Sequence, residues 1–491
     1  MKQLPTEFES RMKRLLGDDF EAFKKALEEQ PSRAFRVNTD KISLEDFERI
    51  DPFSAEKIPH IESGYFFEHD KIGNHPFHHA GMIYVQEPAA MMPAECLDIM
   101  PDWKILDMCA APGGKSTQLK NKLGENGLLV SNEIIPSRCK ILVGNVERLG
   151  LKNTVVTCTS PDKIAERLPK TFDMIMVDAP CSGEGMFRKE EIAIDEWSEE
   201  NVKKCAERQA EILECAARAL KDGGYMVYST CTFSLEENEM TVDKFLSSHP
   251  QFEILPVKEA VRAASEDGIL FEGHENEGLE RARRCYPHKA RGEGQFLALL
   301  HNTNAPTDEP MIAPENRKTA KKDRDQRKNG AKFGEGKGNQ RDASRYGDTR
   351  GKTKAESDMT AAVTEFLDKT LTEYDKSCVK IRNGTPVYIS SEPDLEGITV
   401  FAYGVNIGEV KKNYVLPHHN FFMAMGGLFK NKIELSPESE ELKRYLHGDE
   451  FSVDAPDGWA VITVYGCAVG GAKVAGGTVK NHYPKGLRTK G

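Results

Sequence analysis

The stretch "LDMCAAPGGKSTQL", residues 106 to 119, decides how the chain folds. A buried strand predicted over residues 104–108 passes through a glycine-containing turn into a helix. In doubly wound α/β folds, such a strand–turn–helix unit presents backbone N–H groups to a ligand. The sequence therefore predicts a ligand-binding loop at the carboxyl end of a parallel strand.

Apolar runs and helical patterns alternate from residue 103 to residue 300. This alternation is typical of a parallel sheet with helices on both faces, so we expect an α/β protein with a doubly wound, Rossmann-like core. Further strands are predicted over residues 127–132, 154–158, 172–178, 224–229 and 295–300, and the clearest helices over 137–149 and 202–220.

Composition divides the rest of the chain, because 491 residues are too many for one ordinary core. We predict a disordered basic linker over residues 306–358, since residues 316–354 hold 14 basic and 5 acidic residues and only two aromatic ones. The linker is either a solvated tether or an arm that attracts phosphate. The other predicted parts are a mixed N-terminal segment (1–95), the core (96–305) and an α+β C-terminal extension (359–491).

The overall composition excludes several classes of protein. The net charge of −11 gives no global polycation, and none of the 11 cysteines forms a CxxC pair, so neither a disulfide framework nor a zinc site is expected. The N-terminus has no apolar signal region, and no apolar run reaches eighteen residues. We expect a cytoplasmic protein in a reducing compartment.

The turn after the first strand favours a nucleoside over a nucleoside triphosphate. A phosphate-binding P-loop needs a glycine where Cys109 stands, so "CAAPGGKS" is not one. The second predicted strand ends at Glu133, where an acid commonly bonds the hydroxyl groups of a ribose.

Two cysteines follow neighbouring strands of the predicted sheet. Cys181 lies in "DAPCSGEGMF" (178–187) and Cys231 in "YSTCTFSLEENE" (228–239). Ser234 and Glu237 fit a capping box for the next helix, and a helix N-terminus lowers the pKa of a nearby thiol, so Cys231 is the better candidate nucleophile. Four other cysteines are predicted to be inert core: Cys139, Cys158, Cys205 and Cys215.

Two thiols, an acid and a nucleoside pocket suit methylation of a pyrimidine at carbon 5. A thiolate that adds to carbon 6 makes carbon 5 nucleophilic. An acid near ring nitrogen 3 stabilises the charge created by the addition, and a second cysteine assists release. The target base must leave its stack to reach the crevice.

Three motifs in order, "CAAPGGK", "DAPCSGEG" and "STCTFSLEENE", closely resemble the Sun/Nop family of S-adenosylmethionine-dependent RNA 5-methylcytosine methyltransferases. Upstream, "PSRAFRVNT" (31–39) and "YVQEPAAMM" (84–92) are similar to the family's N-terminal RNA-binding and pre-core segments. The C-terminal "GGAKVAGGTVKNHYPKGLR" (470–488) is similar to the RNA-binding, PUA-like end of the bacterial ribosomal-RNA branch, in an RsmF-like arrangement.

The resemblance implies a role for each matching residue. Cys231 matches the nucleophile, Cys181 the cysteine that helps to free the product, and Asp178 the acid between cofactor and base. Family members often carry an adenine-side acid where this chain has Ser160, with Asp162 two residues on. The residues implied to bind S-adenosylmethionine are Cys109, Ala110, Ala111, Pro112, Gly113, Gly114, Lys115, Glu133, Arg138 and Asp178.

RNA, most of all small-subunit ribosomal RNA, is the expected partner of a monomer that binds no membrane. Alternatives are a transfer-RNA or DNA cytosine-5 methyltransferase, or a non-catalytic RNA-binding assembly factor. Tyr483 is predicted to stack on an exposed base. The basic residues predicted to contact phosphate are Arg33, Arg36, Arg188, Lys189, Lys480, His482, Lys485, Arg488 and Lys490.

Overall fold

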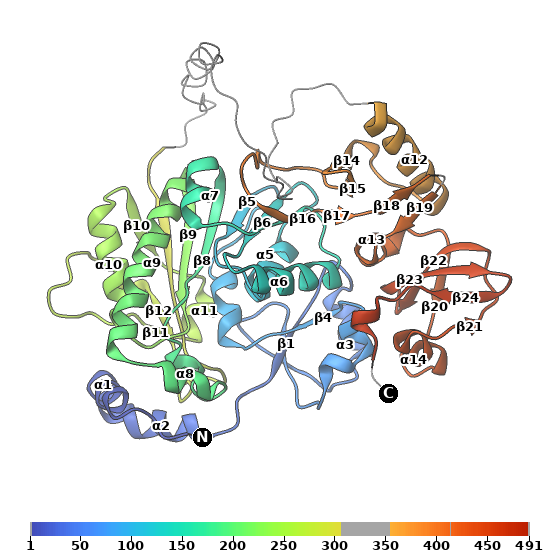
Figure 1. Cartoon of the computed structure of the whole chain (residues 1–491). Helices are drawn as coiled ribbons and strands as arrows, with labels where there is room; N and C mark the ends of the chain where they lie inside the picture. Colours follow the sequence, from blue (N-terminus) through green and yellow to red (C-terminus); the bar gives the residue numbers. More distant parts are fainter. Residues whose placement is uncertain (1, 306–353, 413, 490–491) are drawn as a thin grey trace, which may run out of the picture.

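The computed structural model describes residues 2–305, 354–412 and 414–489 (Figure 1). Most of the predicted basic linker therefore lies outside the described residues. Residues 354–358 belong to helix α12 (Lys354–Thr370), so the prediction of disorder is wrong for this short stretch. Lys490 also lies outside the described residues.

A ten-stranded mixed sheet runs through the centre of the molecule. Its parallel part has the order β7-β6-β5-β8-β9. The chain builds the sheet outward from β5 to β7 on one side and then continues with β8 and β9 on the other, so the strand order reverses between β5 and β8. The predicted doubly wound core is confirmed, and each predicted strand is present. The parallel strands are β5 (Lys104–Asp107), β6 (Leu128–Asn132), β7 (Thr154–Thr157), β8 (Phe172–Asp178) and β9 (Leu220–Thr230).

Antiparallel strands extend the sheet at both edges. On one side β13 (Gln295–Asn302) pairs with β9 and is followed by β12 (Arg283–Cys285) and β11 (Glu266–Asp267), while β10 (Phe252–Leu255) pairs with β13. On the other side β16 (Val400–Tyr403), from the C-terminal region, pairs with β7. The central sheet is thus completed by a strand about 240 residues beyond β7 in the sequence.

Helices cover both faces because successive residues of the buried strands point to opposite sides. Leu106 and Val130 pack with α7 (Pro161–Arg167), α9 (Glu199–Ala219) and α10 (Glu239–Ser248), whereas Ile105 and Leu129 pack with α5 (Gly114–Lys122) and α11 (Glu259–Ala263). Helix α6 (Pro136–Leu149) packs beside the turn between β5 and α5.

The N-terminal region has two separate parts. Helices α1 (Thr6–Leu16) and α2 (Phe20–Glu28) pack against Phe187, Trp197 and Phe233 of the core, next to helix α8 (Glu191–Glu196). A four-stranded antiparallel sheet follows, in the order β2-β3-β1-β4. Its elements are β1 (Ala34–Val37), α3 (Leu44–Ile50), β2 (Glu56–Lys57), β3 (Gly64–Phe66), α4 (Pro76–His79) and β4 (Ile83–Val85).

The C-terminal region contains small sheets, as the sequence predicts. Its last part, a five-stranded sheet with α14 (Glu440–His447), shares one hydrophobic cluster with the N-terminal sheet. The remaining elements are β14 (Val379–Arg382), β15 (Thr385–Tyr388), β17 (Val405–Asn406), β18 (Gly408–Lys411), β19 (Tyr414–Pro417), α13 (His419–Met425), β20 (Lys432–Glu434), β21 (Phe451–Ser452), β22 (Gly458–Val464), β23 (Cys467–Ala475) and β24 (Thr478–Asn481).

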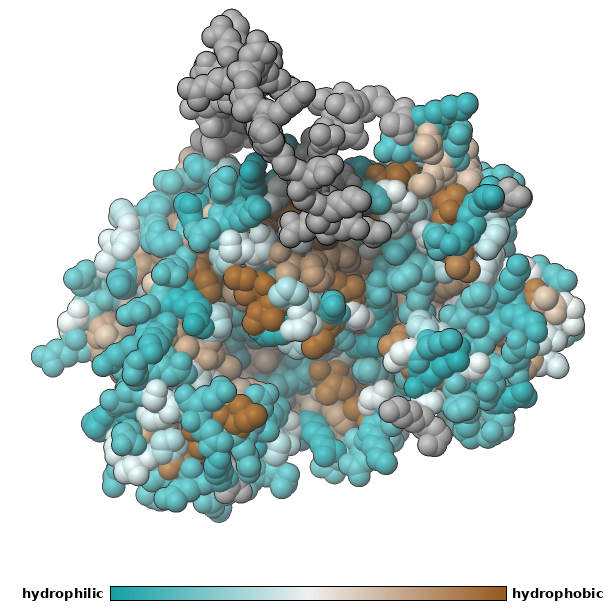
Figure 2. All heavy atoms as spheres, viewed as in Figure 1, coloured by the Kyte–Doolittle hydropathy of each residue, from teal (hydrophilic) through white to brown (hydrophobic). Residues whose placement is uncertain are grey.

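The face seen in Figure 1 is largely hydrophilic, with apolar side chains gathered near its centre (Figure 2). Three isoleucines near helix α6 are exposed to solvent: Ile134 and Ile135 lie directly before the helix, and Ile141 lies within it. Within the described ranges, no helix combines the length and apolarity that a membrane crossing requires.

Candidate active site

The predicted cofactor loop connects β5 with α5 at the point where the strand order reverses. The Ala110 N–H donates to the carbonyl of Asn132 (2.8 Å), and Arg138 donates to the carbonyl of Ala111 (2.9 Å). Gly113 adopts φ +113°, a conformation that favours glycine, and begins α5 without a side-chain cap. The first N–H groups of α5 therefore lack intrahelical acceptors and form a natural site for an anionic or polar ligand.

Glu133 follows β6 at the same edge, as predicted. Its side chain is buried and accepts a hydrogen bond from the Ile135 N–H (2.9 Å), while Arg138 lies 3.3 Å from its other oxygen. Each carboxylate oxygen has two lone pairs, so these contacts leave capacity for ribose hydroxyl groups. Glu133 and Arg138 are thus brought together with the loop that they were predicted to serve.

The contacts of Asp107, at the end of β5, indicate whether the residues around the loop fit a polar cofactor. Its Oδ2 accepts a hydrogen bond from Ser116 (2.6 Å), but its buried Oδ1 has no hydrogen-bond partner among the described residues. Burial raises the pKa of Asp107 to about 7, and Asp178 adds to the rise. A buried acceptor without a donor is rare in folded proteins, so the crevice fits a ligand with N–H or O–H groups, as a nucleoside amino acid has.

Asp178 ends β8 beside Ser229 of β9. Its Oδ1 accepts a hydrogen bond from Ser229 (2.8 Å), and its Oδ2 lies 2.8 Å from the Lys115 ammonium. Burial lowers the pKa of Lys115, but Asp178 more than offsets this effect and the pKa ends above its ordinary value. The cofactor loop and the predicted base-side acid are therefore joined by one ion pair.

The two strand-end cysteines meet. Cys181 Sγ lies 3.2 Å from Cys231 Sγ, next to the register pair of Asp178 and Ser229. The contact with Cys231, together with burial, raises the pKa of Cys181 well above its ordinary value. Cys181 is therefore held as a thiol beside Cys231, which suits a proton-handling partner better than an attacking thiolate.

The sequence interpretation of the Cys231 loop needs one correction. Ser234 and Glu237 do not form a capping box: α10 begins at Glu239, and its N-terminus has no side-chain cap. The Glu237 carboxylate instead accepts hydrogen bonds from the Ser182 N–H (2.9 Å) and from Gln209 (2.9 Å). A tertiary contact has replaced the local one, so the argument from a nearby helix N-terminus no longer applies to Cys231.

The predicted inert cysteines largely behave as core residues. Cys139, Cys205 and Cys215 are buried. Cys158 is only half-buried, because β7 ends at Thr157 and leaves it in the following loop.

The two residues considered for the adenine side of the cofactor follow β7. Ser160 directly precedes α7, and Asp162 in its first turn lies 3.2 Å from Arg218, so the Asp162 carboxylate is already paired.

Three predicted RNA contacts are wrong because their side chains are buried. Arg36 donates to Gln86, to Thr117 and to the carbonyl of Gly114, each at 2.8 Å, so it anchors the start of α5. Arg188 forms a buried ion pair with Glu293 (2.9 Å). Tyr483 is 3% exposed and its hydroxyl lies 2.9 Å from His79, so it cannot stack on an exposed base.

The other predicted contacts lie at or near the surface. Arg33 and Lys189 line a groove of about 690 Å³ with Lys71 and His69, between the N-terminal sheet and the loop that carries Cys181. Lys480 is exposed and lies 2.7 Å from Glu450, His482 and Lys485 are exposed, and Arg488 is half-buried.

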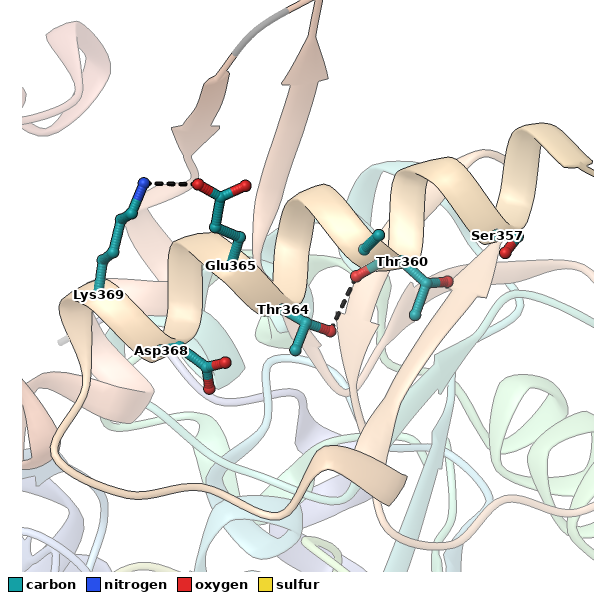
Figure 3. Close-up of a pocket in the computed structure, with 7 residues that line it drawn as sticks. Ser357, Thr360, Thr364, Glu365, Asp368 and Lys369 are labelled. Atoms are coloured by element: carbon teal, nitrogen blue, oxygen red, sulfur yellow. Dashed lines mark hydrogen bonds and ion pairs between the residues drawn. The ribbon is translucent and has the colours of Figure 1, made fainter.

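A second hollow, of about 650 Å³, lies along one face of α12 (Figure 3). Its described lining comes from that single helix and includes the Lys369–Glu365 ion pair (2.6 Å). Figure 1 shows α12 in the C-terminal region, away from the ends of β8 and β9, so this hollow takes no part in the site.

The strand order, the loop at its reversal and Asp178 at the end of β8 define a Rossmann-like site, and the comparisons with known proteins identify its class as that of the methyltransferases. A methyltransferase homologue from Pyrococcus horikoshii has a similar crystal structure, with a TM-score of 0.54 and 31% identity, covering 61% of this chain and 95% of that one.

More particularly, the chain belongs to the 16S rRNA methyltransferase RsmB/F family, whose sequence model matches residues 94–301. Residues 4–88 match the N-terminal domain of 16S rRNA methyltransferase RsmF, and residues 430–489 match the methyltransferase RsmF PUA domain. "Ribosomal RNA small subunit methyltransferase F" of Klebsiella pneumoniae strain 342 is 31% identical over 95% of this chain and 92% of its own length. The protein of that name from Erwinia tasmaniensis is 34% identical over 60% of this chain and 63% of its own.

Proposed function

We propose that this protein methylates carbon 5 of cytosine in small-subunit ribosomal RNA, through a covalent bond between Cys231 and the base. The observation that carries the proposal is the 3.2 Å contact between the Cys181 and Cys231 sulfur atoms, beside Asp178 at the ends of two adjacent strands. The names of the relatives support ribosomal RNA as the substrate. S-adenosylmethionine, when bound, supplies an electrophilic methyl group on a sulfonium sulfur.

The residues of this chain that would hold the cofactor lie at one edge of the central sheet. The loop 109–115 would give backbone N–H groups, Glu133 would accept from the ribose, and Asp107 would offer its unpartnered oxygen to a donor. Lys115 forms an ion pair with Asp178 (2.8 Å) and so holds this side chain at the end of β8, between the cofactor loop and the two cysteines.

The chemistry then follows from the two thiols. Cys231 loses its thiol proton to solvent, and its Sγ gives an electron pair to carbon 6, which makes carbon 5 nucleophilic. Carbon 5 would then take the methyl group that the bound sulfonium supplies, and the sulfonium sulfur would keep the electron pair of the bond that breaks. A water molecule then takes the proton from carbon 5, the electron pair of that C–H bond restores the double bond between carbons 5 and 6, and the bond from carbon 6 to Cys231 Sγ breaks, leaving its electrons on the sulfur. Cys181 assists this release, and Asp178 stabilises the charge on the ring.

The groove beside the Cys181 loop offers a path for the RNA strand. Arg33, Lys71 and Lys189 line it, together with the acidic residues Asp70 and Glu87, and Arg33 pairs with Asp70 (3.0 Å). Its lining also includes Gln86, which bonds Arg36. Positively charged groups along such a groove suit the phosphates that flank an unstacked base.

Methyl transfer from labelled S-adenosylmethionine tests the proposed substrate. The purified protein should label unmodified 16S ribosomal RNA, and bisulfite sequencing should find a cytosine protected only in strains that carry the gene. Labelling of transfer RNA or duplex DNA instead would replace ribosomal RNA as the substrate. RNA binding without labelling of any nucleic acid would overturn catalysis.

Separate substitutions of the two cysteines test their roles. Cys231→Ala should abolish methylation and trap no RNA, because no bond to carbon 6 can form. Cys181→Ala should accumulate a protein–RNA adduct that survives denaturing electrophoresis, because addition proceeds and release stalls. An adduct in Cys231→Ala would exchange the two assignments, as the mechanism of a DNA cytosine methyltransferase requires.

A further inference from the structure

The two cysteine loops are joined by a reciprocal pair of buried glutamates. Glu237, in the Cys231 loop, accepts hydrogen bonds from both the N–H and the hydroxyl of Ser182, the residue after Cys181. Glu184, in the Cys181 loop, accepts from the N–H of Phe233 (3.0 Å), two residues after Cys231. Each loop therefore supplies a carboxylate to a backbone donor of the other.

Neighbouring elements fix both carboxylates. Gln209 of α9 donates to Glu237 (2.9 Å) and also to the carbonyl of Pro180 (3.0 Å), directly before Cys181. Trp197 donates its indole N–H to Glu184 (2.9 Å). The Gly185 N–H donates to the carbonyl of Cys231 (2.8 Å), which ties the loops together a third time.

These glutamates are unusual choices for stability alone. Glu184 is 1% and Glu237 0% exposed, and neither has a basic side chain within 4 Å in the part of the chain that the structure describes. Burial raises the pKa of Glu237 to about 7 and also raises that of Glu184. A buried carboxylate without an ion pair carries a large desolvation penalty, which local hydrogen bonds only partly offset.

We propose that Glu237 and Glu184 are positioning residues: Glu237 holds Cys181 for product release, and Glu184 holds Cys231 for addition to the base. This inference rests on the proposed function. Loss of Glu237 frees Ser182 and Gln209 and so loosens the Cys181 side, whereas Cys231 remains fixed by Gly185, Glu184 and the end of β9. Loss of Glu184 frees Phe233 and Trp197 and so loosens the Cys231 side.

The two alanine variants should therefore fail at opposite steps. With unmodified 16S ribosomal RNA, Glu237→Ala should complete a first methyl transfer at close to the normal rate, then accumulate adduct as Cys181→Ala does, with turnover about 10- to 100-fold lower. Glu184→Ala should form adduct about 10- to 100-fold more slowly and accumulate none. Single-turnover labelling and denaturing electrophoresis separate these outcomes.

Conservative and control variants distinguish positioning from general destabilisation. Glu237→Gln keeps one oxygen for the Ser182 N–H and Gln209, and its amide donates to the Ser182 hydroxyl, which then donates to Thr232 (3.0 Å). It should restore turnover. Asp243→Ala removes another buried acid of the core, which accepts from the N–H of Asn276 (2.9 Å), and should leave the balance between adduct and product unchanged.

The positioning roles would be overturned if Glu237→Ala, Glu184→Ala and Asp243→Ala all slowed adduct formation and product release to the same extent. They would also be overturned if Glu237→Ala formed no adduct while Cys181→Ala formed it. If the wild-type protein transfers no methyl group and Cys181→Ala traps no RNA, the proposed function fails instead, which keeps the two failures distinct.

Discussion

Arg36 belongs to the N-terminal sheet but acts on the cofactor loop of the core. Its guanidinium is 1% exposed, and burial lowers its pKa to about 10. It bonds the Gly114 carbonyl and Thr117 at the first turn of α5, and it holds Gln86 against Gly114. The N-terminal region therefore supports the cofactor loop through a residue whose side chain is buried and bonded to Gln86, Gly114 and Thr117.

Arg36→Met should weaken cofactor binding without blocking folding. The substitution leaves three buried acceptors without their donor, which corresponds to a loss of about 2–4 kcal/mol in stability. The start of α5 should loosen, and the Kd for S-adenosylmethionine measured by calorimetry should rise. Arg33→Met, at an exposed position near the same sheet, provides the control and should leave this Kd unchanged.

Asp107 should make stability depend on pH. Its pKa in the folded protein, about 7, lies above the value near 3.8 of an unperturbed aspartate, so the folded state binds more protons between these values. Its stabilising contribution is complete below pH 4 and falls as the pH rises to 7, by at most about 1.4 kcal/mol per unit.

Comparison with Asp107→Asn isolates this effect from other groups, including its neighbours Asp178 and Lys115. Between pH 5 and pH 8, urea unfolding should show the wild type losing stability relative to the variant. A constant difference across this range would show that Asp107 does not titrate there.

At the scale of elements, two glycines of helix α6 and its C-terminal cap allow the effect of close packing to be separated from that of helix propensity. Gly150 ends the helix with φ +69°, and a Cβ there would lie 2.4 Å from the carbonyl oxygen of Met423, beside α13. Gly144 lies in the exposed interior of the same helix, where a Cβ would meet nothing within 4 Å. The first glycine is required by close packing, and the second is not.

Opposite effects are expected from the same change at these two glycines. Gly144→Ala should stabilise the protein by about 0.5–1 kcal/mol, through helix propensity. Gly150→Ala should destabilise it by about 2 kcal/mol or more, because strain at positive φ adds to the clash with α13. Thermal unfolding of the two variants checks both signs, and equal shifts would contradict the packing argument.

The strands show which elements the sequence predicts well. Four of the five parallel strands, β5 to β8, lie within one residue of their predicted bounds, because they are buried on both faces and form apolar runs. Strand β9 begins at Leu220, four residues before its predicted start, because the polar and glycine residues 221–224 hide its first part. The spacing of Ser234 and Glu237 was misleading, because a capping box and a tertiary carboxylate contact share the same local pattern. Strand β16 pairs with β7 from about 240 residues away, which no local periodicity indicates.

Site residues are likewise predicted well where strand topology determines their position, and poorly where distant segments do. Cys181, Cys231 and Asp178 meet because they end adjacent strands, and the predicted topology already implies this. The burial of Arg36 and Tyr483 depends on partners 78 and 404 positions away, so a basic or aromatic residue in a basic segment was taken for an RNA contact. The sequence gives no sign of the burial of Glu184, and it suggests a local capping role for Glu237 in place of its contact with Ser182, because an acid that is buried by distant segments has the same local pattern as a surface charge.

At the scale of the whole molecule, the N-terminal sheet and the last C-terminal sheet pack together beside the core. Residues of the N-terminal sheet and of the last C-terminal sheet form a single hydrophobic cluster. The Lys41 ammonium bonds the carbonyl of Met423, and Asn38 bonds that of Leu149 at the end of α6 (3.0 Å). Figure 1 shows the orange and red C-terminal elements against the blue N-terminal sheet and the core.

A cut between the core and the C-terminal region should therefore leave the fragments together. When a protease site inserted within residues 306–353 is cleaved, the two pieces should co-elute from gel filtration at the size of the intact chain, because β16 still pairs with β7 and Ala402 still packs beside the cofactor loop. Ala402→Asp places a charge at a half-buried position of that cluster and should weaken the association, so that the pieces separate at a lower denaturant concentration. By contrast, a chain that ends at residue 305 exposes the β7 edge and should self-associate. Immediate separation of the cleaved wild-type fragments at micromolar concentration would show that the C-terminal region is an independent attachment.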